Sequence, residues 1–566
     1  MKYFKGYKVK SVAAVLAKLV EAVFELILPL LMARLIDEGI TQGNMSVVYW
    51  MVFWMFVLTL LGYVSSLVCQ YLASVVSQRV GGRLRSALFA KINTFSIAEY
   101  NHYSSALLTN RITTDVNLIQ EMIARTIRLG VRAPILMIGS LFALNAISPR
   151  LAMALLKTFP IFVIVVVAFM YFSMRGHKKA TQQLDTVVAK VRESLSGTRI
   201  IRAFSKQEES DTLFNEENKV LAKKQRNVGW ITTLSGPMTS LIMNLVLVWL
   251  VYLGALEIQI GTMTQGQTIA VINYCTQLVL TLIVAMNLVM IFSRGYTSSF
   301  RVKEILDTEV SVKNTGSKII DAPFDLEFKN VSFSYPQETR RVINDVSFSV
   351  KPGQVLGIIG LTGSGKSTLV KLIPRFADVS SGVIEIDGTP IQDYDLVSLR
   401  NAIGYVSQSA EFLKASIADN VLMKSSLGNA EDAIIDAQGK DILNKGIEST
   451  VEEGGKNLSG GQRQRLSIAR ALAKNPRLIV FDDSFSALDF LTDKNLRMHL
   501  KEAYNDASQI IISQRTTSVM DADTIFVLDD GRIQDMGTHD YLMEHNEVYR
   551  RIHRIQTEGG AEDVQA

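Results

Sequence analysis

The sequence predicts two joined domains: a six-helix α transmembrane domain with long helical extensions, and an α/β domain of the P-loop type. Long apolar runs fill roughly the first 300 of the 566 residues, and mean hydropathy is positive. The rest alternates short apolar runs with Gly, Asp and Ser, as soluble α/β domains do. Within that part, residues 360–367 fit the phosphate-binding pattern G-x-x-x-x-G-K-[ST].

Charge and cysteine content exclude some classes of protein. The net charge is +5, which is small for 566 residues. Basic residues cluster between the apolar runs, so membrane topology explains them better than binding to nucleic acid, and no nucleic-acid partner is expected. The two cysteines, Cys69 and Cys275, both lie inside apolar runs. They predict neither a disulfide framework nor a metal site.

Six apolar segments are long enough to cross a bilayer, which takes roughly 20 residues each. The connections 77–128 and 174–229 are rich in Lys and Arg, whereas the alternate connections are short and poor in them. The positive-inside rule therefore places both termini and the two long connections in the cytoplasm, which fits an even number of spans. The predicted spans are 14–36, 48–76, 129–148, 151–173, 230–254 and 268–292.

The two long connections are expected to be helical. Apolar residues continue at helical spacing beyond the second span, at Val80, Leu84, Leu88 and Ile92. We therefore predict helices that project into the cytoplasm, each pair joined by a short crosswise segment near 97–103 or 207–214. Ordinary cytoplasmic loops are the alternative.

Two carboxylates stand on one face of the first predicted span. Glu21 and Glu25 are four residues apart, and acidic side chains inside a membrane usually face a cavity or a partner helix. They predict either a contact with a cationic substrate or packing against a polar group on a neighbouring helix.

Composition also sets the expected domain boundaries. Residues 1–305 form the transmembrane domain, 306–325 a polar linker, and 326–554 the nucleotide-binding domain. The polar, Gly-containing residues 555–566 are expected to be a disordered tail.

The phosphate-binding segment predicts a nucleoside triphosphate site with Mg²⁺. It follows an apolar run, 355–359, that indicates a buried strand, and it precedes a helix-like run. Glycines let successive backbone N–H groups point at one anion, and the following helix adds its positive end. Lys366 would reach the β- and γ-phosphates, and the Ser367 hydroxyl would bind Mg²⁺. The expected nucleotide contacts are Gly360, Thr362, Gly363, Ser364, Gly365, Lys366, Ser367 and Thr368.

Further motifs surround this segment in a fixed order. Tyr335 lies ahead of it and could stack on an adenine ring. Gln408 ends a strand and could contact Mg²⁺ and the attacking water. Asp482 ends the buried strand 478–482 and suits Mg²⁺ held through water. A second anion-binding surface is predicted where a helix opens at L-S-G-G-Q, with Ser459, Gly460, Gly461 and Gln462.

This chain resembles an ATP-binding cassette (ABC) exporter half-transporter. The resemblance rests on the order of its motifs: six spans, then the phosphate loop, LSGGQ, the strand acid and Ser486-Ala487-Leu488-Asp489. The resemblance implies a multi-pass protein of a bacterial cell membrane. It also implies a translocating ATPase with ATP and Mg²⁺ as cofactors. It also implies two nucleotide domains closing head to tail, so that the LSGGQ segment completes the partner's ATP site and Asp489 lies between subunits. Residues 193–204 resemble the segment this family carries before its second coupling helix.

Two positions depart from the family pattern. The family usually has a catalytic Glu where this chain has Asp483, and a His where it has Gln514. Asp is one methylene shorter, and a base misplaced by about 1 Å can cost about 100-fold in rate. Gln cannot carry positive charge or relay a proton. We therefore predict a slow ATP site and a heterodimer with a partner half-transporter that supplies the Glu and His; a weakly active homodimer is the alternative.

The predicted function is ATP-driven export by alternating access, of the kind seen in multidrug-type exporters. The expected substrates are amphipathic compounds, either drug-like hydrophobic or cationic small molecules or membrane lipids. The alternatives are a nucleotide-gated channel or regulatory subunit, and a homodimer that translocates peptides or lipids.

Overall fold

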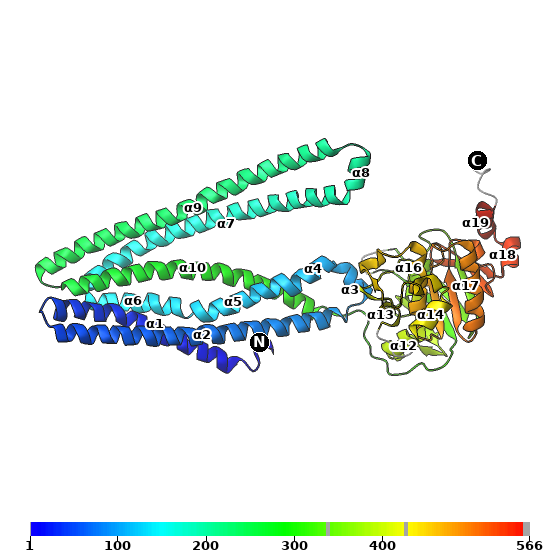
Figure 1. Ribbon diagram of the computed structural model, residues 1–566, viewed down its shortest axis with the longest axis horizontal. Helices are drawn as coiled ribbons and strands as arrows, with labels where there is room; N and C mark the ends of the chain where they lie inside the picture. The colour runs from blue at the N-terminus through cyan, green and yellow to red at the C-terminus, as the bar shows by residue number, and fades with distance from the viewer. Residues whose placement is uncertain (1, 336–339, 424–427, 558–566) are drawn as a thin grey trace. The chain divides into compact units, whose positions relative to one another are not determined.

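The computed structural model describes residues 2–335, 340–423 and 428–557 (Figure 1). Its contacts divide the chain into two compact units. The first, which we call the helical unit, comprises the chain up to Ala90 and Thr109–Asp307. The second, the sheet unit, comprises Lys91–Leu108 and the chain from Thr308 onward. The predicted domain boundaries differ from this division in leaving residues 91–108 with the membrane helices.

Every named element of the helical unit is helical. Five of these helices have 27 to 54 residues, whereas the helices of soluble domains average about 11–12 residues. They are η1 (Lys2–Phe4), α1 (Lys8–Arg34), η2 (Leu35–Ile40), α2 (Met45–Ile92), α4 (Ser105–Asn110), η3 (Arg111–Asp115), α5 (Val116–Leu129), α6 (Arg132–Ile147), α7 (Pro149–Ser196), α8 (Thr198–Ala203), α9 (Gln207–Ile260) and α10 (Gln265–Asp307).

Five helical segments of the described chain are long and apolar enough to cross a membrane. They contain α2, α4 to α6, α7, α9 and α10. The predicted count of six is therefore not confirmed. The first predicted span corresponds to α1, which has 27 residues but carries Lys18, Glu21 and Glu25 within its apolar stretch.

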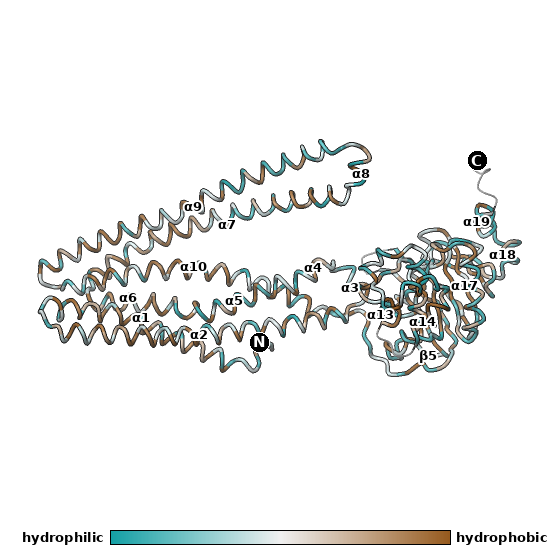
Figure 2. Tube along the Cα trace, in the orientation of Figure 1, coloured by the Kyte–Doolittle hydropathy of each residue, from teal (hydrophilic) through white to brown (hydrophobic). Residues whose placement is uncertain are grey.

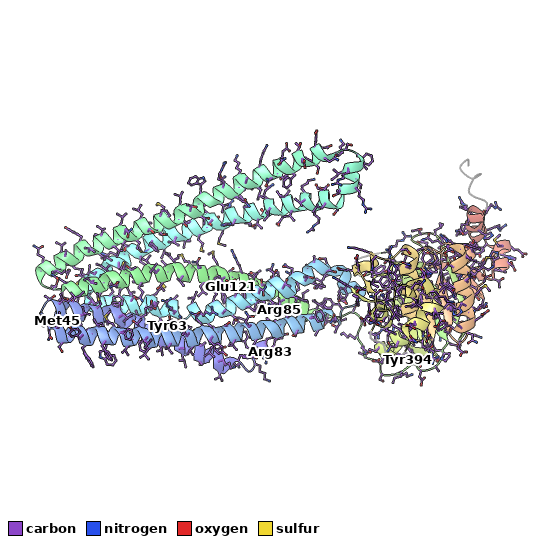
Figure 3. All side chains as sticks on the ribbon, in the orientation of Figure 1. Met45, Tyr63, Arg83, Arg85, Glu121 and Tyr394 are labelled. Carbon is purple, nitrogen blue, oxygen red and sulfur yellow. The ribbon has the colours of Figure 1, made fainter. Side chains whose placement is uncertain are left out.

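Apolar and polar residues separate along these helices. In α2, Met45 and Tyr63 lie in the apolar part and are 65% and 61% exposed, whereas Arg83 and Arg85 lie further along the helix (Figure 3). α7 and α9 likewise become hydrophilic toward α8 (Figure 2). Exposed apolar side chains over one part of each helix are expected where lipid replaces water as the solvent.

α7 and α9 run side by side, and α8 joins them at the hydrophilic end (Figure 1). The predicted crosswise segment at 207–214 is therefore wrong, because those residues form the first turns of α9. α7 ends at Gly197, and the turn after α8 places Ser205 at a positive φ of 51°. These two backbone breaks fix the crosswise helix at Thr198–Ala203.

The remaining helices pack closely around buried polar contacts. At Gly139 of α6, a Cβ would lie 2.3 Å from Leu26 Cδ1 of α1, so a larger residue there would require the Leu26 side chain to move. Asp115, at the end of η3, is 1% exposed and accepts hydrogen bonds at 2.8 Å from Arg111 and from Ser298 of α10. Arg301 of α10 lies 2.8 Å from the same carboxylate.

The sheet unit contains three sheets with helices between and around them. Its strand orders are β2-β1-β4-β5, β12-β11-β3-β10-β9-β6 and β7-β8. The six-stranded sheet is parallel except for its edge strand β12. The strands are β1 (Leu326–Phe333), β2 (Ile343–Val350), β3 (Val355–Ile359), β4 (Ser381–Ile386), β5 (Thr389–Pro390), β6 (Ile403–Val406), β7 (Ala415–Ser416), β8 (Thr450–Val451), β9 (Leu478–Asp482), β10 (Ser508–Ile512), β11 (Thr524–Asp529) and β12 (Arg532–Gly537).

Helices of the sheet unit lie largely between its strands in the sequence. They are α3 (Ile97–His102), α11 (Lys366–Lys371), η4 (Ile391–Asp393), α12 (Leu396–Ala402), α13 (Ile417–Leu422), α14 (Ala430–Asp436), α15 (Lys440–Leu443), η5 (Glu453–Gly455), α16 (Gly460–Leu472), α17 (Phe490–Ala503), η6 (Thr516–Ser518), α18 (His539–His545) and α19 (Glu547–Thr557). α19 extends into the predicted tail, and residues 558–566 of that tail lie outside the described residues.

The six-stranded sheet is buried on both faces. In β3, Val355 and Ile359 belong to one hydrophobic core, and Leu356 and Ile358 belong to the other. A strand with two buried faces is a continuous apolar run, which explains the sequence of residues 355–359. β10 lies between β3 and β9, and all three run parallel, so their carboxyl ends meet at one edge.

α3 is held to the start of the linker within the sheet unit. Ser96 and Glu99 form a capping box at its first turn. The other Glu99 oxygen accepts the Ser311 backbone N–H at 3.1 Å, and Tyr103 bonds to Thr308 at 3.2 Å. The predicted crosswise segment at 97–103 thus corresponds to a real short helix.

Candidate functional site

The phosphate-binding segment forms a tight loop between β3 and α11. Gly363 and Gly365 have φ values of 86° and 101°, which L side chains rarely adopt. At Gly365 an added Cβ would also lie 2.9 Å from the Val342 carbonyl oxygen. The loop therefore requires glycine at this position for both reasons, and it delivers the chain into the first turn of α11.

Lys366 lies folded against this loop. It is 8% exposed, and its Nζ donates to the carbonyl oxygens of Gly360 at 2.8 Å and Leu361 at 2.7 Å. Burial lowers the pKa of the ammonium, while Asp483 and Asp482 act in the opposite direction. A buried cation held by neutral carbonyls, at the positive end of a helix, suits an anionic phosphate.

Asp482 ends β9 beside the phosphate loop and is 2% exposed. Its Oδ1 accepts the Ser367 hydroxyl at 2.6 Å, and its Oδ2 accepts the Tyr405 hydroxyl at 2.9 Å. Burial raises the pKa of Tyr405, so this partner stays neutral. The Asp482 oxygens and the Ser367 hydroxyl are the hard donors that Mg²⁺ prefers. These residues fit Mg²⁺.

Asp483 follows Asp482 at a positive φ of 51°. Its Oδ2 accepts hydrogen bonds from Gln408 at 3.3 Å and from Gln514 at 3.5 Å. Its backbone N–H donates to the Ile512 carbonyl oxygen at 3.1 Å, which ties it to the end of β10. Three residues predicted from separate parts of the sequence thus meet at one point.

The environment of Asp483 favours its protonated form. Burial raises the pKa of this carboxyl, and neighbouring Asp482 adds to the rise. Hydrogen bonding to Gln408 and the charge of Lys366 oppose it. The side-chain amides of Gln408 and Gln514 are neutral and do not accept protons. Asp483 therefore cannot pass a proton taken from water on to either of them.

The L-S-G-G-Q segment lies at the start of α16. Ser459 and Gln462 form a capping box there, with each side chain bonded at 3.2 Å to the other residue's backbone N–H. Gln462 also donates to Asp441 at 3.0 Å, and Asp441 is paired with Arg465 at 2.7 Å. These contacts fix the segment while leaving Gly460 exposed and Gly461 partly exposed.

The other predicted residues occupy defined places. Asp489 caps α17 by accepting the Thr492 backbone N–H at 3.0 Å. Tyr335 is hydrogen-bonded to Thr368 of α11 at 3.2 Å, which brings its ring next to the helix that follows the phosphate loop.

Two contacts in the site had no place in the sequence-based prediction. Tyr405 lies within β6, and only its neighbouring position to β9 brings it to Asp482. Gln556 of α19 donates to the Gln514 carbonyl oxygen at 2.6 Å and accepts the Thr516 backbone N–H at 2.9 Å. The Tyr405 contact had a weak signal in the sequence, a Tyr near the end of a strand. The Gln556 contact had no signal, because it joins segments 42 residues apart.

In the helical unit, both predicted carboxylates are paired with cations. Glu21 accepts from Lys18 of the same helix at 2.6 and 2.8 Å. Glu25 is paired with Arg132 of α6, with the closest oxygen at 2.7 Å from Nη2. The prediction of a polar partner on a neighbouring helix thus describes Glu25. Arg132 was not among the predicted site residues, although a lone Arg inside the segment 129–148 was a visible signal.

Two family descriptions match this chain. Residues 11–282 match the family described as ABC transporter transmembrane region. Residues 343–486 match the family described as ABC transporter. The two matches divide between the long helices and the unit that holds the phosphate loop.

Individual proteins are similar over nearly the full length. The chain is 34% identical to the "Uncharacterized ABC transporter ATP-binding protein YfiB" of Bacillus subtilis, over 98% of each chain. It is 28% identical to the "ATP-dependent lipid A-core flippase" of Escherichia coli K12, over 97% of this chain and 96% of that one. A solved bacterial Atm1-family ABC exporter with ATP bound shares the fold, with a TM-score of 0.81, 23% identity, and coverage of 99% and 100%.

Proposed function

This chain belongs to the ABC transporter family, and from that premise we propose that it is the hydrolysis-impaired half of a heterodimeric exporter of amphipathic compounds. As a family member it is a multi-pass membrane protein and a translocating ATPase that uses ATP with Mg²⁺. ABC exporters act as dimers, and the partner in this proposal is a second half-transporter with a Glu and a His at the two departing positions.

The observation that carries the proposal is the meeting of Asp483, Gln408 and Gln514 beside a complete Mg²⁺ and phosphate site. Lys366 provides a cation for the phosphates, and Ser367 and Asp482 provide oxygen donors for Mg²⁺. The residue next to them, where a base would act, is a short carboxylate bonded to two amides. Such a site binds nucleotide well and hydrolyses it slowly.

The intact L-S-G-G-Q segment supports the other half of the proposal. In a head-to-tail pair, this segment contributes to the partner's ATP site, which has the Glu and His and turns over normally. ATP at the slow site would then hold the nucleotide domains near contact, while hydrolysis at the partner's site resets the transporter. ATP favours the closed state only by its higher affinity for that state.

We also propose that α1 is the sixth span. The three charged side chains within its apolar stretch are paired: Lys18 with Glu21, and Glu25 with Arg132. Paired charges inside a membrane are far less costly than isolated ones. With six spans, both termini lie on the cytoplasmic side, as the loop charges predict.

Lipids are the substrates that the relatives favour. The similar proteins of Escherichia coli and Pectobacterium atrosepticum are named as lipid A-core flippases, and we propose that this chain also moves a lipid or a lipid-like amphiphile. ATP-dependent uptake into inside-out vesicles, with the partner co-expressed, tests transport directly across lipids, cationic dyes and peptides.

ATP hydrolysis by the chain alone, compared with the co-purified pair, tests the heterodimer. We expect the lone chain to hydrolyse ATP at least about tenfold more slowly, because its own sites have no well-placed base. Equal rates for the lone chain and the pair would show an active homodimer instead.

The double variant Asp483→Glu with Gln514→His tests the cause of slow turnover. It restores the longer carboxylate and a titratable partner, and we expect hydrolysis by the lone chain to rise by about 10- to 100-fold. The matched control is Asp506→Glu, the same lengthening in an exposed turn outside the site. If the double variant stays as slow as the control, something other than these two side chains limits the rate.

A further inference from the structure

A cavity of about 580 Å³ lies within the helical unit. Its walls come from α1, α6 and α10, with Met55 of α2 and Leu129 of α5. These three helices pack against one another in pairs and lie side by side (Figure 1). A volume of this size suits a drug-sized molecule or a lipid head group with the first part of its chains.

One ion pair forms part of the wall. Arg132 of α6 donates through Nη2 to both oxygens of Glu25, at 2.7 and 2.8 Å, and through Nε to Oε2 at 3.2 Å. The side chains are 31% and 32% exposed. Both charged groups are thus accessible from the cavity while they hold each other.

The formal charge of the cavity is zero. Among the described residues that line it, Glu25 and Arg132 are the two charged ones, and the others are apolar or carry neutral polar groups. A ligand with a net charge would leave one charge in the cavity without a counter-charge, which is unfavourable away from bulk water. A ligand with one positive and one negative group can exchange with the pair and leave every charge matched.

The polar groups near the pair suit a compact head group. Asn273, Thr276, Gln277 and Thr281 line the cavity from α10. Pro29 of α1 has no N–H, so the Glu25 carbonyl oxygen lacks its usual helical donor and can accept a bond from an ammonium group. The planar guanidinium of Arg132 matches two oxygens of a phosphate at once.

The apolar lining continues from these polar groups. Leucine, methionine, valine and alanine side chains contribute most of the remaining wall, and flexible methionines adapt to chains of different shape. The set comprises Leu28, Met32, Met55, Leu129, Ala133, Leu136, Leu280 and Val284.

We propose that this cavity binds amphiphiles with a zwitterionic head group, with the phosphate against Arg132 and the ammonium against Glu25. The inference rests on the proposed function, export of amphiphiles, and names the substrate class of that transporter. It also replaces the expectation of a cationic substrate at Glu25, because Arg132 already neutralises that carboxylate.

Binding of three single-chain probes to the full-length transporter in detergent tests the proposal. The probes have equal chain length: lysophosphatidylcholine as the zwitterion, lysophosphatidylglycerol as the anion, and an alkyltrimethylammonium as the cation. We expect the zwitterion to bind about tenfold more tightly than either charged probe, as measured by native mass spectrometry or by competition.

Single substitutions of Glu25 or Arg132 should shift the binding preference from the zwitterion to one of the charged probes. Glu25→Gln leaves Arg132 unmatched and should favour the anion, whereas Arg132→Gln leaves Glu25 unmatched and should favour the cation. The double variant Glu25→Gln with Arg132→Gln removes both charges, is expected to fold, and should bind the three probes about equally. Arg150→Gln is the matched control, because it breaks an ion pair with Glu257 outside the cavity and should keep the zwitterion preference.

A zwitterion preference that is unchanged in both single variants, or equal binding of all three probes by the unmodified protein, would overturn the proposal. ATP-driven transfer of the same probes into vesicles separates it from the proposed function. Selective binding without ATP-driven transfer contradicts export and leaves the cavity's selectivity standing. Transfer of all three probes at equal rates contradicts the selectivity alone.

Discussion

Asp115 in the helical unit and Asp482 in the sheet unit are equally buried, at 1% and 2% exposure, but have opposite kinds of partner. Asp115 lies 2.8 Å from both Arg111 and Arg301. Asp482 is bonded to two neutral hydroxyls, at 2.6 and 2.9 Å. A carboxylate surrounded by cations has its charge compensated and serves the fold. A carboxylate bonded to neutral hydroxyls has no counter-charge in these contacts and remains able to bind a cation.

This difference separates structural carboxylates from those expected to act on ligands. Breaking a buried charge pair leaves an uncompensated charge and destabilises a protein strongly. Neutralising a carboxylate held by hydroxyls leaves no such charge behind, so the fold should tolerate it while cation binding is lost. Glu25 lies between the two cases, because its partner is a cation but both face a cavity.

The largest expected effect is on stability, from Asp115→Asn. The amide leaves the two arginines without a counter-charge, and we expect the free energy of unfolding to fall by about 3 kcal/mol. The thermal midpoint of the purified protein in detergent measures this. Glu121→Gln is the matched control, since Glu121 of α5 (Figure 3) forms an exposed pair with Arg125 at 3.2 Å and should cost less than about 0.5 kcal/mol. Similar losses for both variants would remove the distinction between buried and exposed pairs.

The next effect is on nucleotide binding, from Asp482→Asn. The amide oxygen still accepts from one hydroxyl, so the thermal midpoint should change little, but the negative charge is gone. We expect the gain in ATP affinity on adding Mg²⁺ to fall by about 100-fold. ATP affinity measured with and without EDTA isolates the contribution of Mg²⁺ to ATP binding. An unchanged Mg²⁺ effect would show that Asp482 is as structural as Asp115.

The smallest effect is a pH dependence at Asp483. Because burial raises its pKa in the folded protein, its stabilising contribution is complete below the unfolded value of about 3.9 and is lost as pH rises through the folded value. Asp483→Asn should therefore raise the thermal midpoint at pH 7 relative to the unmodified protein, and the gain should shrink toward pH 4. Solvent screening of this half-buried group keeps the change on the order of 1–2 °C.

Asp489 supplies the control of opposite sign. The hydrogen bond from the Thr492 backbone N–H lowers its pKa, so its contribution is present above the unfolded value and is lost as pH falls through the folded value. Asp489→Asn should therefore lose stability at pH 7 and recover it in acid. A pH response of the same sign in both variants would contradict the contrast between the two carboxylates.

The sequence predicted the local structure of the nucleotide-binding motifs because that structure depends on neighbouring residues. The phosphate loop, the L-S-G-G-Q capping box and the acid at the end of β9 each depend on a few consecutive residues. The crosswise helix was misplaced because its position depends on two backbone breaks, at Gly197 and Ser205, rather than on periodicity. The span count was not confirmed because α1 carries charges whose partners the pattern did not reveal.

By itself, the sequence determined the two kinds of domain, the nucleotide-binding motifs and the two departures at Asp483 and Gln514. Only the tertiary structure decided which side chains meet: Glu25 with Arg132 across 107 positions, Asp115 with Ser298 across 183, and Tyr405 with Asp482 across 77. The physical reason is that periodicity and motif chemistry are local properties of a chain. The partner of a buried charge depends instead on how helices are rotated and which strands are neighbours.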